Sequence, residues 1–143
     1  ALAIMPQLAG FVPMLTGTGG NCGSQSSTLV IRGLAVGEIE FRDLLKVIWK
    51  EIRIAVCISI VLAVVNGLRI MLMGQGGALM AFTIGLTMAC TVVIAKVVGC
   101  TLPLIAKRVG LDPAIMATPL ISTLVDISTI SVYFAIVSAV FQL

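Results

Sequence analysis

Asp126 is an acidic residue in an otherwise apolar segment, and its position makes it a candidate ligand. It follows Ala114 by 12 residues, or about 18 Å along a helix, which places its carboxylate near the middle of a bilayer. An ionisable group at that depth is costly and by default indicates function. Hydroxyl residues share its helix face: Thr118, Ser122, Thr123, Thr129 and Tyr133. This stripe predicts a path for a hydrated cation; the alternative is a helix–helix contact made by hydroxyl groups.

A second polar stripe lies near the N-terminus, within and after a glycine-rich run. Its members are spaced by four, three and four residues: Asn21, Gln25, Thr28 and Arg32. Amide oxygens and glycine carbonyls would offer neutral acceptors to a cation that keeps its waters. The alternative is that the small residues only allow close helix packing. Pro6, Pro13 and the glycines of residues 17–23 predict that this helix is interrupted.

Lys96 is a second ionisable residue in an apolar segment. It precedes Lys107 by 11 residues, which corresponds to a depth of about 16 Å along a helix. A short turn joins its segment to that of Asp126, so the two side chains are candidates for an ion pair within the membrane. The alternative is that Lys96 extends toward the membrane surface or faces a wet cavity.

The composition indicates an integral membrane protein. Of the 143 residues, 59% are hydrophobic and only 10% are charged, and the mean hydropathy is +1.20. A soluble domain carries about 25% charged residues, so soluble enzymes and nucleic-acid binders are excluded. The chain has no histidine and no closely spaced cysteine pair, which argues against a zinc site and Ser-His-Asp catalysis. We therefore expect no enzymatic activity.

The chain is long enough for four membrane-spanning helices, and the sequence predicts an all-α bundle. The spans are expected at about residues 1–31, 54–73, 78–104 and 114–143. Residues 32–53 hold nine of the fifteen charged side chains, and they predict an amphipathic connection with Trp49 at the membrane surface. The basic residues of 32–53 and 107–113 place both connections in the cytoplasm. The missing initiator Met suggests a piece of a longer protein.

Four segments resemble MgtE-type magnesium channels, which are related to the eukaryotic magnesium solute carriers. The first two are TGTGGNCGSQ at residues 16–25 and LVIRGLA at residues 29–35. They resemble the family's second membrane helix. The others are KRVGLDPA at residues 107–114 and PLISTLVD at residues 119–126, which resemble its last turn and last helix. The resemblance covers nearly the whole chain.

The resemblance implies a homodimer of five-helix subunits in the plasma membrane, with the pore at the dimer interface. It also implies that Asp126 holds hydrated Mg²⁺ with help from the backbone at Ser122. The two polar stripes add Thr118, Thr129, Asn21 and Gln25 as residues expected to line the path. Thr118 and Ser24 stand where the family commonly has Asn, and Lys96 where a small or amide residue is expected. Most bacterial members carry a regulatory soluble domain, for which this chain has no counterpart.

The chemistry of Mg²⁺ agrees with this interpretation. Mg²⁺ keeps several waters and binds through one or two carboxylates, the number that Asp126 supplies when two-fold symmetry doubles it. Mn²⁺ and Co²⁺ are alternative ions. The alternative functions are an antiporter coupled to H⁺ or Na⁺ and a membrane assembly subunit that transports nothing. Membrane lipid and a second copy of the chain are the expected partners.

Overall fold

Four long helices form the molecule. The computed structural model describes residues 5–116 and 118–142, and within these ranges every regular element is helical. The long helices are α1 (Met5–Ala35), α2 (Leu44–Leu72), α3 (Gly77–Arg108) and α4 (Thr118–Phe141). Two short 3-10 turns, η1 (Phe41–Asp43) and η2 (Pro113–Met116), precede α2 and α4. The prediction of an all-α membrane bundle is confirmed.

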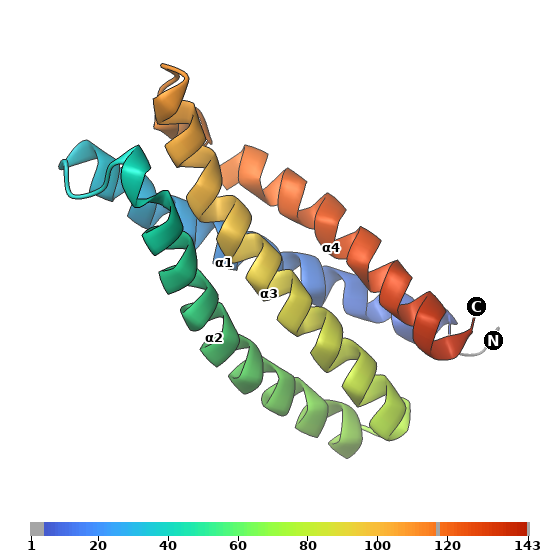
Figure 1. Cartoon of the computed structure of the whole chain (residues 1–143). Helices are drawn as coiled ribbons and strands as arrows, with labels where there is room; N and C mark the ends of the chain where they lie inside the picture. The colour runs from blue at the N-terminus through green and yellow to red at the C-terminus, as the bar shows by residue number, and fades with distance from the viewer. Residues whose placement is uncertain (1–4, 117, 143) are drawn as a thin grey trace.

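The third helix is the centre of the bundle. α3 packs against α1, α2 and α4 and buries residues along its whole length, from Met80 to Ala106. α1 and α3 run in one direction and α2 and α4 in the other, so that the two chain ends lie at the same end of the bundle (Figure 1). The predicted alternation of helix directions is therefore present.

Three of the described helices are long and apolar enough to cross a membrane. They cover residues 41–72, 77–108 and 119–141. α1 has 31 residues, which is also sufficient length, but its glycine, hydroxyl and amide residues lower its hydropathy. The outer face of α2 is apolar and exposed at Ile60, Val64 and Leu68, as expected of a surface that contacts lipid.

Two features differ from the sequence prediction. α1 continues through the glycine-rich run without a break, with Pro13 inside the helix, because a helix satisfies its backbone groups internally where water is absent. The amphipathic helix expected in part of residues 32–53 is present but is not a separate element. Leu44 to Arg53 form the beginning of α2 and continue directly into the predicted second span. Trp49 in this part is exposed, in agreement with an anchor at the membrane surface.

Glycines let α1 lie close to its neighbouring helices. A Cβ atom at Gly19 would lie 2.8 Å from side-chain atoms of Thr91 and Val125, so α3 and α4 approach the helix there. A Cβ atom at Gly99 of α3 would overlap the backbone carbonyl of Gly23. Gly19 and Gly23 therefore allow close helix packing. The prediction that the glycine-rich run interrupts the helix was wrong.

Replacing Gly99 by Ala is expected to lower the free energy of unfolding by about 2–3 kcal/mol, since the added methyl group meets backbone that cannot rotate away. Gly67→Ala is the matched control, because that helical position has no atom within 4 Å of a new Cβ. The control should unfold like the wild type or be slightly more stable. Unfolding in detergent, followed by circular dichroism, measures both. Equal stability of Gly99→Ala and Gly67→Ala would contradict the close α1–α3 crossing.

Candidate functional site

An open groove runs between α1 and α4. Its volume is about 410 Å³, and its lining residues are small, polar or acidic: Pro13, Thr16, Gly17, Gly20, Asn21, Ser24, Ser122 and Asp126. α4 contributes Ser122 and Asp126 from successive turns, and α1 contributes the rest. The groove therefore brings together three predicted site residues, Asp126, Ser122 and Asn21, from opposite ends of the sequence.

Local helix geometry explains which side chains reach the groove. On α4, Ile121 and Val125 point into the core and are fully buried, so their neighbours Ser122 and Asp126 lie at the edge of that face. On α1, Gly17 and Gly20 leave room because they have no side chain; a Cβ atom at Gly20 would lie 3.6 Å from the Ser122 hydroxyl oxygen. The groove therefore reaches the Ser122 hydroxyl group where α1 has no side chain.

The carboxylate of Asp126 is half-buried and open to the groove. Within residues 5–116 and 118–142 it makes no ion pair and accepts no hydrogen bond from a side chain. The hydroxyl oxygen of Ser24, on the opposite wall, is buried and likewise has no hydrogen-bond partner in the described part of the chain. Oxygen atoms on both walls are therefore available to a ligand with positive charge.

The depth of Asp126 differs from the sequence estimate. α4 begins at Thr118 rather than Ala114, and Pro113–Met116 form η2 instead. Asp126 is then eight residues from the helix start, which corresponds to about 12 Å. The carboxylate lies nearer to the end of the bundle formed by residues 107–113 than predicted. The side chain of Thr118 lies outside the described residues, so its predicted place in the path is untested.

Two other members of the polar stripe on α4 serve packing. Thr129 is buried, with its hydroxyl oxygen 3.1 Å from where a Cβ of Gly19 would lie, and it does not line this groove. Tyr133 is also buried and donates a hydrogen bond of 2.8 Å to the carbonyl oxygen of Leu8. Here the alternative interpretation, a helix–helix contact, is correct. Gln25 does not line the groove either; its side-chain oxygen accepts a hydrogen bond from Lys96.

The predicted ion pair between Lys96 and Asp126 is wrong. The Lys96 ammonium lies 3.2 Å from a carboxylate oxygen of Glu51 on α2, and both side chains are almost fully buried. It also donates a hydrogen bond of 3.2 Å to the side-chain oxygen of Gln25. Lys96 therefore points toward α2 and α1, whereas Asp126 faces the groove on α4. Adjacency of two helices in the chain does not decide which way their side chains point.

Glu51 is the residue that sequence reasoning missed. It was grouped with the charged side chains of residues 32–53 and expected at the membrane surface. A signal was present: Ala55 and Ser59 follow it at intervals of four residues, and all three share the buried face of α2. A carboxylate in register with small residues on a helix face indicates an inward position.

The helices and the groove define a class of protein: an all-α integral membrane protein with a groove between two of its helices, lined by small and polar residues and one carboxylate. The family follows from comparison with known sequences. Residues 12–136 match the model of the MgtE family, described as a divalent cation transporter. The chain belongs to this family, whose members are transporters and not enzymes.

Three relatives, each named magnesium transporter MgtE, agree with this assignment. The chain is 34% identical over 139 residues to the protein from Thermus thermophilus, covering 94% of this chain and 30% of the relative. It is 36% identical over 139 residues to that from Bacillus subtilis, covering 97% and 31%. The Enterococcus faecalis protein is 34% identical over 134 residues, with 92% and 29% covered. The chain thus spans about a third of the length of these relatives.

Proposed function

We propose that this chain conducts Mg²⁺ across the membrane along the groove between α1 and α4, with Asp126 as the central ligand. The observation that carries the proposal is the carboxylate of Asp126, which faces a groove with hydroxyl and amide side chains on its walls and forms no ion pair with the described residues. Ser122 and Asn21 assist from the two walls. The names of the relatives support Mg²⁺ as the transported ion.

The ligand set favours a hydrated ion. Within the described residues no group of three or more acidic, cysteine or histidine side chains could hold a metal ion, and Asp126 is the one carboxylate that lines the groove. Mg²⁺ keeps several waters and needs only one or two carboxylates. Contacts through these waters are also weak enough to release the ion at the far side. Mn²⁺ and Co²⁺ share this chemistry and stay alternative ions.

The proposal includes a homodimer. The groove is open along one side of the single chain, and a second copy related by two-fold symmetry would close it and bring a second Asp126 to the ion. In this arrangement the protein lies in the plasma membrane with residues 32–53 and 107–113 on the cytoplasmic side. A regulatory soluble domain, if joined to the protein, would act from that side.

Divalent cations are expected to stabilise the wild type against heat, whereas Asp126→Asn should lose most of that stabilisation. The reason is mass action, since an ion that binds only the folded state raises the melting temperature of the protein. Melting curves of the purified protein in detergent, titrated with MgCl₂, MnCl₂ and CoCl₂, measure the effect and rank the ions. KCl at matched ionic strength is the control. Equal Mg²⁺ stabilisation of the wild type and Asp126→Asn would remove Asp126 as the ligand.

The antiporter alternative has lost its structural support. A Lys96–Asp126 pair would have favoured exchange of a cation against H⁺ or Na⁺, but Lys96 is paired with Glu51. We therefore propose passive conduction, driven by the gradient of the ion itself. Mg²⁺ uptake into vesicles with no opposing H⁺ or Na⁺ gradient is expected; uptake only with such a gradient would favour the antiporter. An assembly subunit would show no uptake at all.

A further inference from the structure

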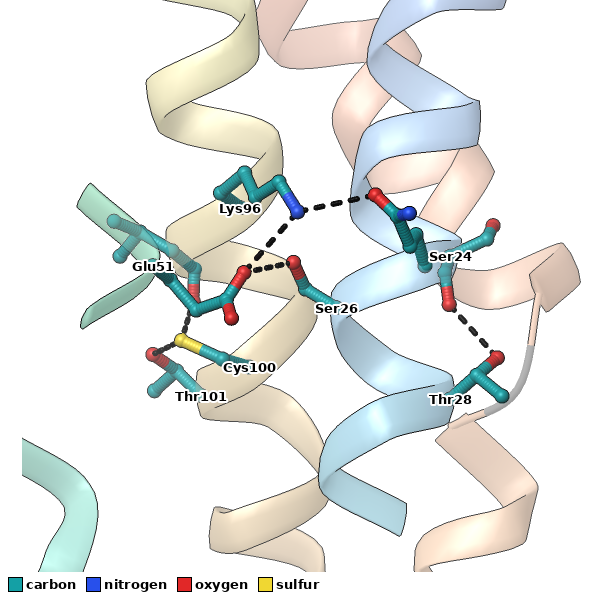
Figure 2. A network of polar contacts seen from close by, with 9 residues as sticks. Ser24, Ser26, Thr28, Glu51, Lys96, Cys100 and Thr101 are labelled. Carbon is teal, nitrogen blue, oxygen red and sulfur yellow. Dashed lines mark hydrogen bonds and ion pairs between the residues drawn. The ribbon is translucent and has the colours of Figure 1, made fainter. Parts of the chain in front are cut away.

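A buried network of polar side chains joins α1, α2 and α3 next to the groove (Figure 2). Lys96 of α3 lies 3.2 Å from the Glu51 carboxylate of α2 and donates a hydrogen bond of 3.2 Å to the Gln25 oxygen of α1. The hydroxyl group of Ser26, also on α1, donates to the same carboxylate oxygen of Glu51. One charge of each sign is buried, so the network is neutral.

The chemistry of the ammonium group sets the orientation of the Gln25 amide. An ammonium nitrogen can only donate hydrogen bonds, so the atom of Gln25 that it contacts must be the carbonyl oxygen. The amide nitrogen of Gln25, which can only donate, is then the polar atom left for other partners. Lys96 itself is held in place by Glu51, because an unpaired charge at that depth would be strongly unfavourable.

Gln25 is next to groove-lining residues on α1, although its own side chain does not line the groove. It follows Ser24 directly and lies one helical turn beyond Asn21, and both of these residues line the groove. Gln25 is itself exposed on the surface of the chain. A hydrated cation points the hydrogen atoms of its waters outward and therefore binds acceptors. An amide that presents only its nitrogen offers no acceptor at this point.

We propose that Lys96 and Glu51 are positioning residues that set the cation affinity of the groove by turning the Gln25 oxygen away from the ion. The proposal rests on the function proposed above. Lys96 holds the oxygen inward, Glu51 neutralises Lys96, and the groove keeps the acceptors of Asp126, Ser122 and Asn21. The result is weaker binding and faster release at the end of the path, which conduction requires.

Exchanging the two charges tests this proposal. In the double variant Lys96→Glu, Glu51→Lys the pair stays neutral, and the lysine at position 51 can donate to the Ser26 hydroxyl oxygen. The glutamate at position 96 can only accept, so Gln25 must turn its nitrogen inward and its oxygen outward. We expect Mg²⁺ to bind about threefold to tenfold more tightly, as one added hydrogen bond would produce. The dissociation constant from melting titrations measures this shift.

A matched control shows whether the effect passes through Gln25. Gln25→Leu removes the amide, so the charge exchange should leave Mg²⁺ affinity unchanged in that background. If the affinity rises equally with Leu at position 25, the charges act directly and the proposal is overturned. It is also overturned if the charge exchange has no effect in the wild-type background.

A second variant covers the case in which the charge exchange does not fold. Lys96→Met together with Glu51→Gln removes both charges at nearly constant volume and frees the Gln25 oxygen without forcing it outward. A smaller rise in Mg²⁺ affinity, again lost with Gln25→Leu, is expected; unchanged affinity overturns the proposal.

Asp126→Asn distinguishes failure of the proposed function from failure of the positioning role. If that variant binds Mg²⁺ like the wild type, the proposed function itself fails, whereas loss of binding there with no effect at position 96 rejects only the positioning role.

Discussion

Asp126→Asn is expected to reduce Mg²⁺ flux into proteoliposomes by about a hundredfold or more. Asn has nearly the same shape as Asp but carries no charge, so the groove keeps its size and loses its attraction for the ion. A carboxylate acting on a divalent cation at the contact distance of one water contributes several kcal/mol even at a protein dielectric constant of about 20. Loss of this term empties the groove of ions at ordinary Mg²⁺ concentrations. A Mg²⁺-sensitive dye trapped inside the vesicles measures the flux.

The control for this measurement is an acidic residue remote from the groove. Glu40→Gln removes an exposed carboxylate whose only ion pair among the described residues is with Arg42, and an exposed pair contributes little. Its flux should equal that of the wild type. Both variants should elute as the wild type does in gel filtration, which excludes misfolding. Wild-type flux in Asp126→Asn would refute the proposed role of the groove.

Lys96→Met as a single change is expected to lower the free energy of unfolding by about 3–5 kcal/mol, because it leaves the buried Glu51 carboxylate without its counter-charge. Methionine has nearly the length of lysine, so little of this loss reflects a cavity. Adding Glu51→Gln should restore most of the stability, since no charge then stays buried. Unfolding by SDS titration, followed by circular dichroism, measures each variant and the coupling between the two positions.

Lys46→Met is the matched control for that experiment. Lys46 pairs with Asp43 at 3.3 Å, but the lysine side chain is 85% exposed, and solvent screening limits such a pair to less than about 1 kcal/mol. Equal destabilisation by Lys96→Met and Lys46→Met would show that the Lys96–Glu51 pair is accessible to water. The difference between the two variants therefore measures burial of the pair directly.

Much of the candidate site could be predicted from local pattern. Asp126, Ser122 and Asn21 each belong to a polar stripe at helical spacing, and the structure brings all three to one groove. The spacing did not distinguish side chains that line the groove from side chains that pack in the core. Thr129 and Tyr133 have the same spacing as Ser122 and Asp126 but face the core. Spacing fixes the face of a helix; the neighbouring helix decides whether that face is open or covered.

The sequence by itself determined the membrane class, the four helices, the alternation of their directions and the family. Each of these depends on composition or on local periodicity, which the chain carries without reference to its packing. Only the tertiary structure decided that Lys96 pairs with Glu51, that α1 runs unbroken past its glycines, and that the Gln25 side-chain oxygen accepts a hydrogen bond from Lys96. These features depend on which side chains meet across different helices, since a buried charge takes the nearest counter-charge in space, whatever their separation along the chain.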